Sequence, residues 1–346
     1  MENHELTMTQ DPVEDISGRV ISAIDLGVEE ESGEEENAGE HPNFIESNTQ
    51  AISLEDLTTK CIVPTFSDNT LTISHQNFIA CVAKAAGAVY GEITPIEIRV
   101  SHPINGRVPE ALYKKDSELS EADRTLFYQR MAFVSHIASL TRIVNGQEVH
   151  LCFGGVRAYN EDRLYARKAP MKFKIFVGWQ VKVCSNLMLT CSGNSGVIEC
   201  LTEADVYQKA FRLFSSFNPD KENQLKILED LHNTKLTEEQ FCHIVGRLRL
   251  YQFLPNDQKT GLPEICLGDQ IINAAVKGFV ENPNFGTVEG PDYSCYSMMQ
   301  NLNEAAKASY IDKWLDRNQN CTDFAIGISK YLAGDSSGAC FGWFLS

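Results

Sequence analysis

Lysine and aromatic side chains alternate along one predicted strand, where they could contact a phosphate backbone and stack on bases. Every second side chain of a strand points the same way, so one face carries Lys172, Lys174, Phe176 and Lys182. The segment leading to this strand adds Arg157, Tyr159, Arg163, Arg167 and Lys168. Cations follow phosphates and aromatic rings stack on bases without reading sequence. The pattern favours a surface for single-stranded DNA or RNA.

The same residues also have a plainer interpretation. Lysines are common on exposed strand faces, where they discourage pairing with another chain. The helices that follow in the sequence could also cover this face. Alternation alone does not separate these interpretations.

Two other groups of residues suggest hydrolytic chemistry, and each lacks a required part. Residues 334–338 match G-x-S-x-G, but a nucleophile elbow needs a strand before it and a histidine after it. A helix is predicted before this segment, and His243 is the last histidine. Cys184 and His150 could act as nucleophile and base if their strands adjoin, although a buried thiol near a sheet histidine is the simpler interpretation.

Metal and cofactor motifs are missing from the sequence. The 11 cysteines include no Cys-x-x-Cys pair, and no two histidines stand four residues apart as in a zinc-binding helix. Neither phosphate-binding glycine pattern, G-x-x-x-x-G-K-[ST] or G-x-G-x-x-G, occurs. We therefore expect no metal, no cofactor and no enzyme activity. Scattered thiols and the lack of any long apolar run predict a reduced, cytoplasmic protein without membrane contact.

The predicted strands lie between residues 130 and 184. Asn145-Gly146 favours a two-residue hairpin turn, which would pair Val144 with Gln147 and Arg142 with Val149. The same register would pair Leu140 with Leu151 and Ala138 with Phe153. In the third strand the alternation predicts a buried face, consisting of Phe173, Ile175, Val177, Trp179, Val181 and Val183. Gly178 suggests a bend, and Gly154-Gly155 a bulge or a close backbone approach.

Charge and periodicity divide the chain into three parts. Residues 1–60 hold 16 acidic and 2 basic side chains, against 31 and 28 in the remainder. Residues 1–50 are therefore predicted to be a disordered acidic tail that aids solubility, with nucleic-acid mimicry or self-inhibition as alternatives. Residues 51–200 form an α+β sheet domain, and residues 201–346 form a helical region packed on the sheet.

The expected fold class is α+β: an antiparallel β-sheet with flanking helices, followed by a helical C-terminal half. Ser53 and Ser74 favour helix starts, and a further helix is expected over residues 119–128, with Ser120 and Asp123 as its cap. The C-terminal periodicity predicts helices over residues 202–216, 220–233, 237–253, 268–280, 295–315 and 321–333.

Several motifs resemble an uncharacterised family encoded on conjugative and prophage-like mobile elements of gut anaerobes. They are TLTISHQNFI (70–79), IRVSHPINGRVPEAL (98–112), RMAF (130–133), GGVRAYN (154–160), FVGWQVKVCSNL (176–187), LTEEQFCHIVGRLRLYQFLP (236–255) and KASYIDKWLDRNQN (307–320). The element Val183–Asn186 is also similar to one in phage/plasmid-like proteins. The resemblance implies a mobile-element gene expressed in a cytoplasm, and it assigns no catalytic residue.

Together these observations favour a non-enzymatic accessory protein of a mobile element that binds single-stranded nucleic acid through the basic and aromatic face. The alternative is a protein-binding module, an inhibitor or partner of a host or plasmid factor, without nucleic-acid contact. The acidic tail and the missing catalytic constellation support this alternative.

Overall fold

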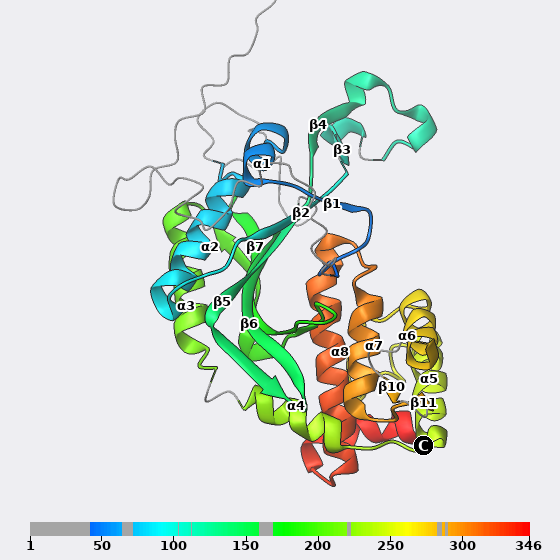
Figure 1. Ribbon diagram of the computed structural model, residues 1–346. Helices are drawn as coiled ribbons and strands as arrows, with labels where there is room; N and C mark the ends of the chain where they lie inside the picture. Colours follow the sequence, from blue (N-terminus) through cyan, green and yellow to red (C-terminus); the bar gives the residue numbers. More distant parts are fainter. Residues whose placement is uncertain are drawn as a thin grey trace, which may run out of the picture.

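The computed structural model describes residues 42–63, 72–102, 104–111, 113–158, 169–219, 223–281, 286–287 and 290–346. Its centre is a curled antiparallel sheet with helices on both faces (Figure 1). Most helices follow the sheet in the sequence, so the predicted α+β class is confirmed. No helix in these described ranges is both long and apolar enough to cross a membrane.

The main sheet has the order β1-β2-β5-β6-β7, and both β8 and β9 pair with the outer edge of β7. Its strands are β1 (Thr49–Ala51), β2 (Glu97–Ser101), β5 (Met131–Val144), β6 (Gln147–Arg157), β7 (Met171–Val181), β8 (Leu187–Met188) and β9 (Asn194–Cys200). Two small hairpins stand apart, β3 (Ile104–Arg107) with β4 (Arg124–Tyr128) and β10 (Gly286–Thr287) with β11 (Gly290–Pro291).

The β5–β6 hairpin turns at Asn145 and Gly146, whose φ angles of 49° and 80° fit the predicted turn. Val144 pairs with Gln147 and Arg142 with Val149, as expected. Farther from the turn the predicted register is wrong, because β5 bulges between residues 136 and 141. In the bulge the chain bonds instead to residues 92–94.

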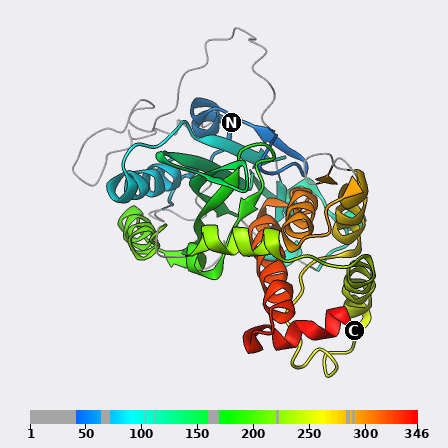
Figure 2. The same ribbon diagram turned by 60° about the horizontal axis from the view of Figure 1, so that its bottom comes forward.

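Both faces of the sheet are covered (Figure 2). Helices α2 (His75–Tyr90) and α3 (Glu203–Ser216) pack over the face predicted to be buried, where Phe173 and Trp179 are at most 1% exposed. Helix α8 (Ile311–Leu332) packs over the other face, where Trp314 contacts Phe176. The strands therefore lie in the middle of three layers.

Adjacent glycines allow this close packing in β6. A Cβ at Gly154 would overlap the Phe133 carbonyl oxygen and the Phe176 ring, and one at Gly155 would overlap the Phe78 ring. The prediction of a close backbone approach is confirmed. The suggested bend at Gly178 is replaced by another close approach, to the Met188 carbonyl on β8.

The remaining helices are α1 (Leu54–Lys60), α4 (Gln224–Asn233), α5 (Glu238–Phe253), α6 (Asp269–Glu281) and α7 (Cys295–Ala306), with a 3₁₀ segment, η7 (Ser336–Leu345), after α8. The helix predicted over residues 295–315 is two helices, because the chain turns after Ala306 and α8 begins at Ile311. The helix predicted over residues 119–128 is wrong. The Ser120–Asp123 hydrogen bond forms, but the β-prone residues that follow become β4.

Residues 1–41, most of the predicted acidic tail, lie outside the described residues. Residues 42–50 of that tail are packed against the body. Phe44 is 1% exposed, and its ring lies 5.3 Å from that of Trp314 on α8. The Glu46 amide donates to the Lys307 carbonyl.

The turn after β7 fastens the sheet to α7 through buried polar groups. Asn186 Nδ2 donates to both the carbonyl and the Oε1 of Gln300, and Lys307 Nζ donates to the Cys184 carbonyl. Ser185 has a φ of 53°. The Val183–Asn186 element noted in the sequence therefore links β7 to α7 and helps to fix the positions of α7 and α8.

A groove along helix α8

The structure describes five of the nine residues of the predicted nucleic-acid surface, and three of these five are buried. Tyr159, Arg163, Arg167 and Lys168 lie outside the described residues. Of the others, Arg157, Lys174 and Phe176 are at most 3% exposed. Lys172 is half-buried, and Lys182 is exposed but bonds Glu148 at 2.9 Å.

Helix α8 buries two of these side chains, Lys174 and Phe176. Lys174 Nζ reaches Asp316 Oδ2 at 3.1 Å and the Asp312 carbonyl at 3.4 Å, so its charge has partners under the helix. The Phe176 ring lies 5.8 Å from that of Trp314. Arg157 belongs to the opposite face, where it donates to the Ile73 carbonyl and lies 5.0 Å over the Phe173 ring. The structure therefore separates side chains that the sequence grouped together.

His150 and Cys184 are not arranged as a base and a nucleophile. His150 contacts Thr141 at 2.9 Å and Glu148 at 3.3 Å. The Cys184 thiol is buried against Gln300, and burial raises its pKa to about 12. A thiol with that pKa is protonated at neutral pH and is a poor nucleophile.

Residues 334–338 do not form a nucleophile elbow. They join α8 to η7, where the Asp335 side chain caps the Ser337 amide. A helix therefore precedes the motif, as the sequence predicted. Within the described ranges, no group of three or more His, Cys, Asp or Glu side chains could hold a metal ion.

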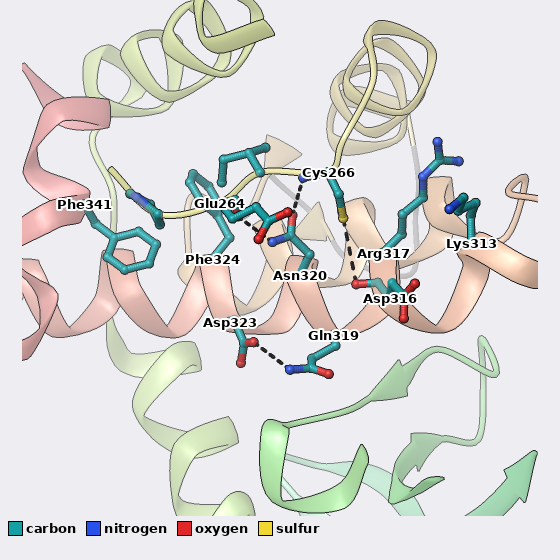
Figure 3. Close-up of a pocket in the computed structure, with 12 residues that line it drawn as sticks. Glu264, Cys266, Lys313, Asp316, Arg317, Gln319, Asn320, Asp323, Phe324 and Phe341 are labelled. Atoms are coloured by element: carbon teal, nitrogen blue, oxygen red, sulfur yellow. Dashed lines mark hydrogen bonds between the residues drawn. The ribbon is translucent and has the colours of Figure 1, made fainter. Parts of the chain in front are cut away.

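A groove of about 750 Å³ runs along the outer side of α8. Its walls are residues 263–266 between α5 and α6, the side chains of α8, and Phe341 of η7 (Figure 3). This volume falls within the range of about 300–1,000 Å³ typical of ligand sites.

Asn320 of α8 holds one wall of the groove in place. Its Oδ1 accepts from the Cys266 amide at 3.0 Å, and its Nδ2 donates to the Glu264 carbonyl at 2.7 Å. The Cys266 thiol lies 3.9 Å from the Asp316 carbonyl. These two hydrogen bonds between the Asn320 side chain and the main chain hold residues 264–266 against α8. The groove therefore has a fixed wall.

The two ends of the groove differ in chemistry (Figure 3). Lys313 and Arg317 stand one turn apart at one end. Phe324 and Phe341 form the other end, with ring centroids 6.0 Å apart. Gly327 lets η7 come this close, since a Cβ there would overlap the Phe341 ring.

Acidic groups also line the groove, and their environments differ. Asp316 is paired with Lys174. Asp323 accepts from Gln319 Nε2 at 3.1 Å, and burial raises the pKa of its carboxyl. Burial likewise raises the pKa of the Cys266 thiol to about 11. At neutral pH the Cys266 thiol is therefore protonated, and the groove presents charged and aromatic side chains but no thiolate.

Sequence analysis did not identify this groove. The predicted helices stopped at residue 315 and resumed at 321, which divided the stretch holding Arg317 and Asn320. One signal was present: the motif KASYIDKWLDRNQN (307–320) contains Lys313, Arg317 and Asn320. The partners of Asn320, residues 264 and 266, lie 56 and 54 residues earlier in the sequence, and no periodicity connects the two segments.

Fold and groove together define an α+β protein with a polar groove on its C-terminal helices. The chain belongs to the family described as "Domain of unknown function, B. Theta Gene description (DUF3871)", whose model matches residues 28–345. The expected membership in an uncharacterised family is confirmed. No curated protein and no solved structure matches the chain.

Proposed function

We propose that this protein is a non-enzymatic binding protein that holds a segment of a partner polypeptide in the α8 groove. The observation that carries the proposal is the groove itself, about 750 Å³ in volume, with a cationic and an aromatic end. Lys313 and Phe324 are 11 residues apart on α8, a rise of roughly 16 Å. An extended polypeptide covers that length with about five residues.

Charge favours a polypeptide over a nucleic acid. Glu264, Asp316 and Asp323 line the same groove as Lys313 and Arg317. A uniformly anionic backbone would meet repulsion along this mixed surface, whereas a polypeptide can match it residue by residue. Residues 61–346 hold 31 acidic and 28 basic side chains, so they carry no net positive charge that would attract a polyanion.

The resemblance to mobile-element proteins supports a host or plasmid protein as the partner, in a cytoplasm. The mobile-element origin, the host or plasmid partner and the cytoplasmic location are therefore part of the proposal. Single-stranded nucleic-acid binding stays a prediction as well, and among its described residues Lys172 is half-buried and Lys182 is exposed.

The experiment selects peptides from a displayed random library on the intact protein and then maps where they bind. A photo-reactive phenylalanine analogue replaces Glu264, an exposed groove residue. We expect the selected peptides to cross-link at this position and not at Lys277, an exposed position on α6. Selected peptides that cross-link equally at both positions, or a selection that yields no binder, would overturn the proposal.

A further inference from the structure

The cationic end of the groove has charge available for a ligand. Lys313 is exposed, and no described residue forms an ion pair with it. Arg317 uses Nη1 to donate to Ser309 Oγ at 2.9 Å and keeps other N–H groups for a second acceptor. Asp316 stands between them in sequence, but its carboxylate is bound to the nearly buried Lys174. A ligand carboxylate at this end therefore meets two cations, Lys313 and Arg317. The nearby Asp316 carboxylate is already paired with Lys174.

The aromatic end offers apolar contact of limited size. Phe324 is buried, so it forms the floor, while the half-buried Phe341 forms a wall. Pro263 and Ile265 lie on the facing side. This end suits one large apolar side chain, since rings of this kind gain energy by offset or edge contacts with another ring.

The amide side chains in the middle of the groove are already hydrogen-bonded within the protein. Both polar atoms of the Asn320 amide are bonded to residues 264 and 266, and Gln319 donates to Asp323. Ligand selection thus falls to the two ends. Arg317 and Phe324 are seven residues apart on α8, a rise of roughly 10 Å, which an extended peptide spans in about three residues.

We infer that the groove recognises a polypeptide segment with an acidic side chain about three positions from an aromatic one. The carboxylate lies between Lys313 and Arg317, and the aromatic ring packs against Phe341. This inference rests on the proposed function and adds the chemistry of the bound segment. Charge complementarity at one end and ring contact at the other select such a segment over neutral or basic ones.

The test titrates the intact protein with labelled hexapeptides whose termini are blocked, so that no terminal charge takes part. The reference peptide has an aspartate three positions before a phenylalanine, with glycines elsewhere. We expect lysine in place of aspartate, or alanine in place of phenylalanine, to weaken binding by about tenfold. Equal binding of all three peptides, or no binding of the reference peptide at about 1 mM, overturns the inference.

Charge reversal on the protein gives the matched control. Lys313→Glu should weaken the aspartate peptide by about tenfold and favour the lysine peptide. Lys330→Glu makes the same change at an exposed position of α8 outside the groove and should alter neither. Equal effects of the two substitutions would overturn the inference.

The outcomes separate the inference from the proposed function. Library peptides that cross-link at position 264 but lack the acidic and aromatic pair would overturn the inference and leave the proposed function standing. An absence of groove binders of any composition would overturn both.

Discussion

The two faces of the central sheet are buried by different means. Under α2 and α3 the face is mostly apolar, with Phe173, Val177 and Trp179 in one hydrophobic cluster and the buried Arg157 over the Phe173 ring. Under α8 the face mixes Phe176 and Trp314 with ion pairs, Lys174 to Asp316 and Arg130 to Asp312. Lysines on a strand therefore do not establish that this face of the sheet is exposed to solvent. A helix packed on the face can supply carboxylates that pair with the lysines.

Removing a large buried aromatic side chain from each side of the sheet should cause the largest loss of stability. Such a loss on both sides would show that both faces of the sheet belong to the core. Trp314→Ala under α8 and Trp179→Ala on the other face should each lower the free energy of unfolding by about 3–5 kcal/mol. Both side chains are 1% exposed. Urea denaturation measures the loss, with exposed Tyr310→Ala as control. A loss below about 1 kcal/mol for Trp314→Ala would mean that α8 is not packed as described.

The adjacent glycines of β6 test how closely each face of the sheet is packed. Gly154→Ala and Gly155→Ala should each destabilise by about 1–3 kcal/mol through overpacking. The loss should be larger at Gly154, because its Cβ would meet the Phe133 carbonyl, whereas at Gly155 it would meet rings. Gly246→Ala in α5, where a Cβ has open space, should be neutral or stabilising. Thermal unfolding ranks the three, and the reverse order at the two β6 positions would contradict the packing.

His75, at the start of α2, makes stability depend on pH. Burial, helped by the nearby Arg157 charge, lowers its pKa from 6.5 to about 3. The unfolded chain takes up this proton below about pH 6.5 while the folded chain stays neutral, so stability falls as the pH falls through that window. Between pH 7 and pH 5 the loss should be about 2 kcal/mol.

The variant His75→Gln cannot take up this proton, so it should lose about 2 kcal/mol less than the wild type over the same pH range. Urea titrations at the two pH values measure the difference. An equal loss in both proteins would show that His75 is not held neutral in the folded state.

The ion pair under α8 should have the smallest and most asymmetric effect. Lys174→Met keeps volume and removes a buried charge, and it should change the free energy of unfolding by less than about 1 kcal/mol. Asp316→Asn leaves the ammonium without its counter-charge and should cost about 1–2 kcal/mol, reduced because Asp316 is 46% exposed. Chemical denaturation compares them. A larger loss for Lys174→Met than for Asp316→Asn would contradict the assignment of the pair.

Local patterns predicted much of the fold. Strand alternation identified the face under α2 and α3 except at Val183, which is exposed beyond the end of β7, and Asn145-Gly146 identified the hairpin turn. The register beyond residue 141 could not be predicted, since the bulge depends on bonds to residues 92–94. Cover by later helices was one interpretation of the face with Lys174 and Phe176, but the pattern could not identify α8, about 140 residues later in the chain, as the helix that covers it.

The candidate site was harder to predict than the fold. Its cationic side chains lie on α8, its second wall is held by Asn320, and Phe341 arrives from η7. Each segment looks ordinary alone, because a lysine and an arginine one turn apart are typical of any exposed helix. Only the tertiary contact between residues 263–266 and α8 turns these side chains into a groove.

We propose that ligands bind on the outer side of α8 and not on the sheet face beneath it. The most direct measurement is fluorescence anisotropy at low salt with two probes, labelled single-stranded DNA and the aspartate–phenylalanine peptide. Wild type, Lys313→Glu and Lys172→Glu are compared. We predict peptide binding that Lys313→Glu weakens by about tenfold and that Lys172→Glu leaves unchanged. DNA binding that falls steeply with salt and is weakened by Lys172→Glu would contradict the account and place the ligand on the sheet face.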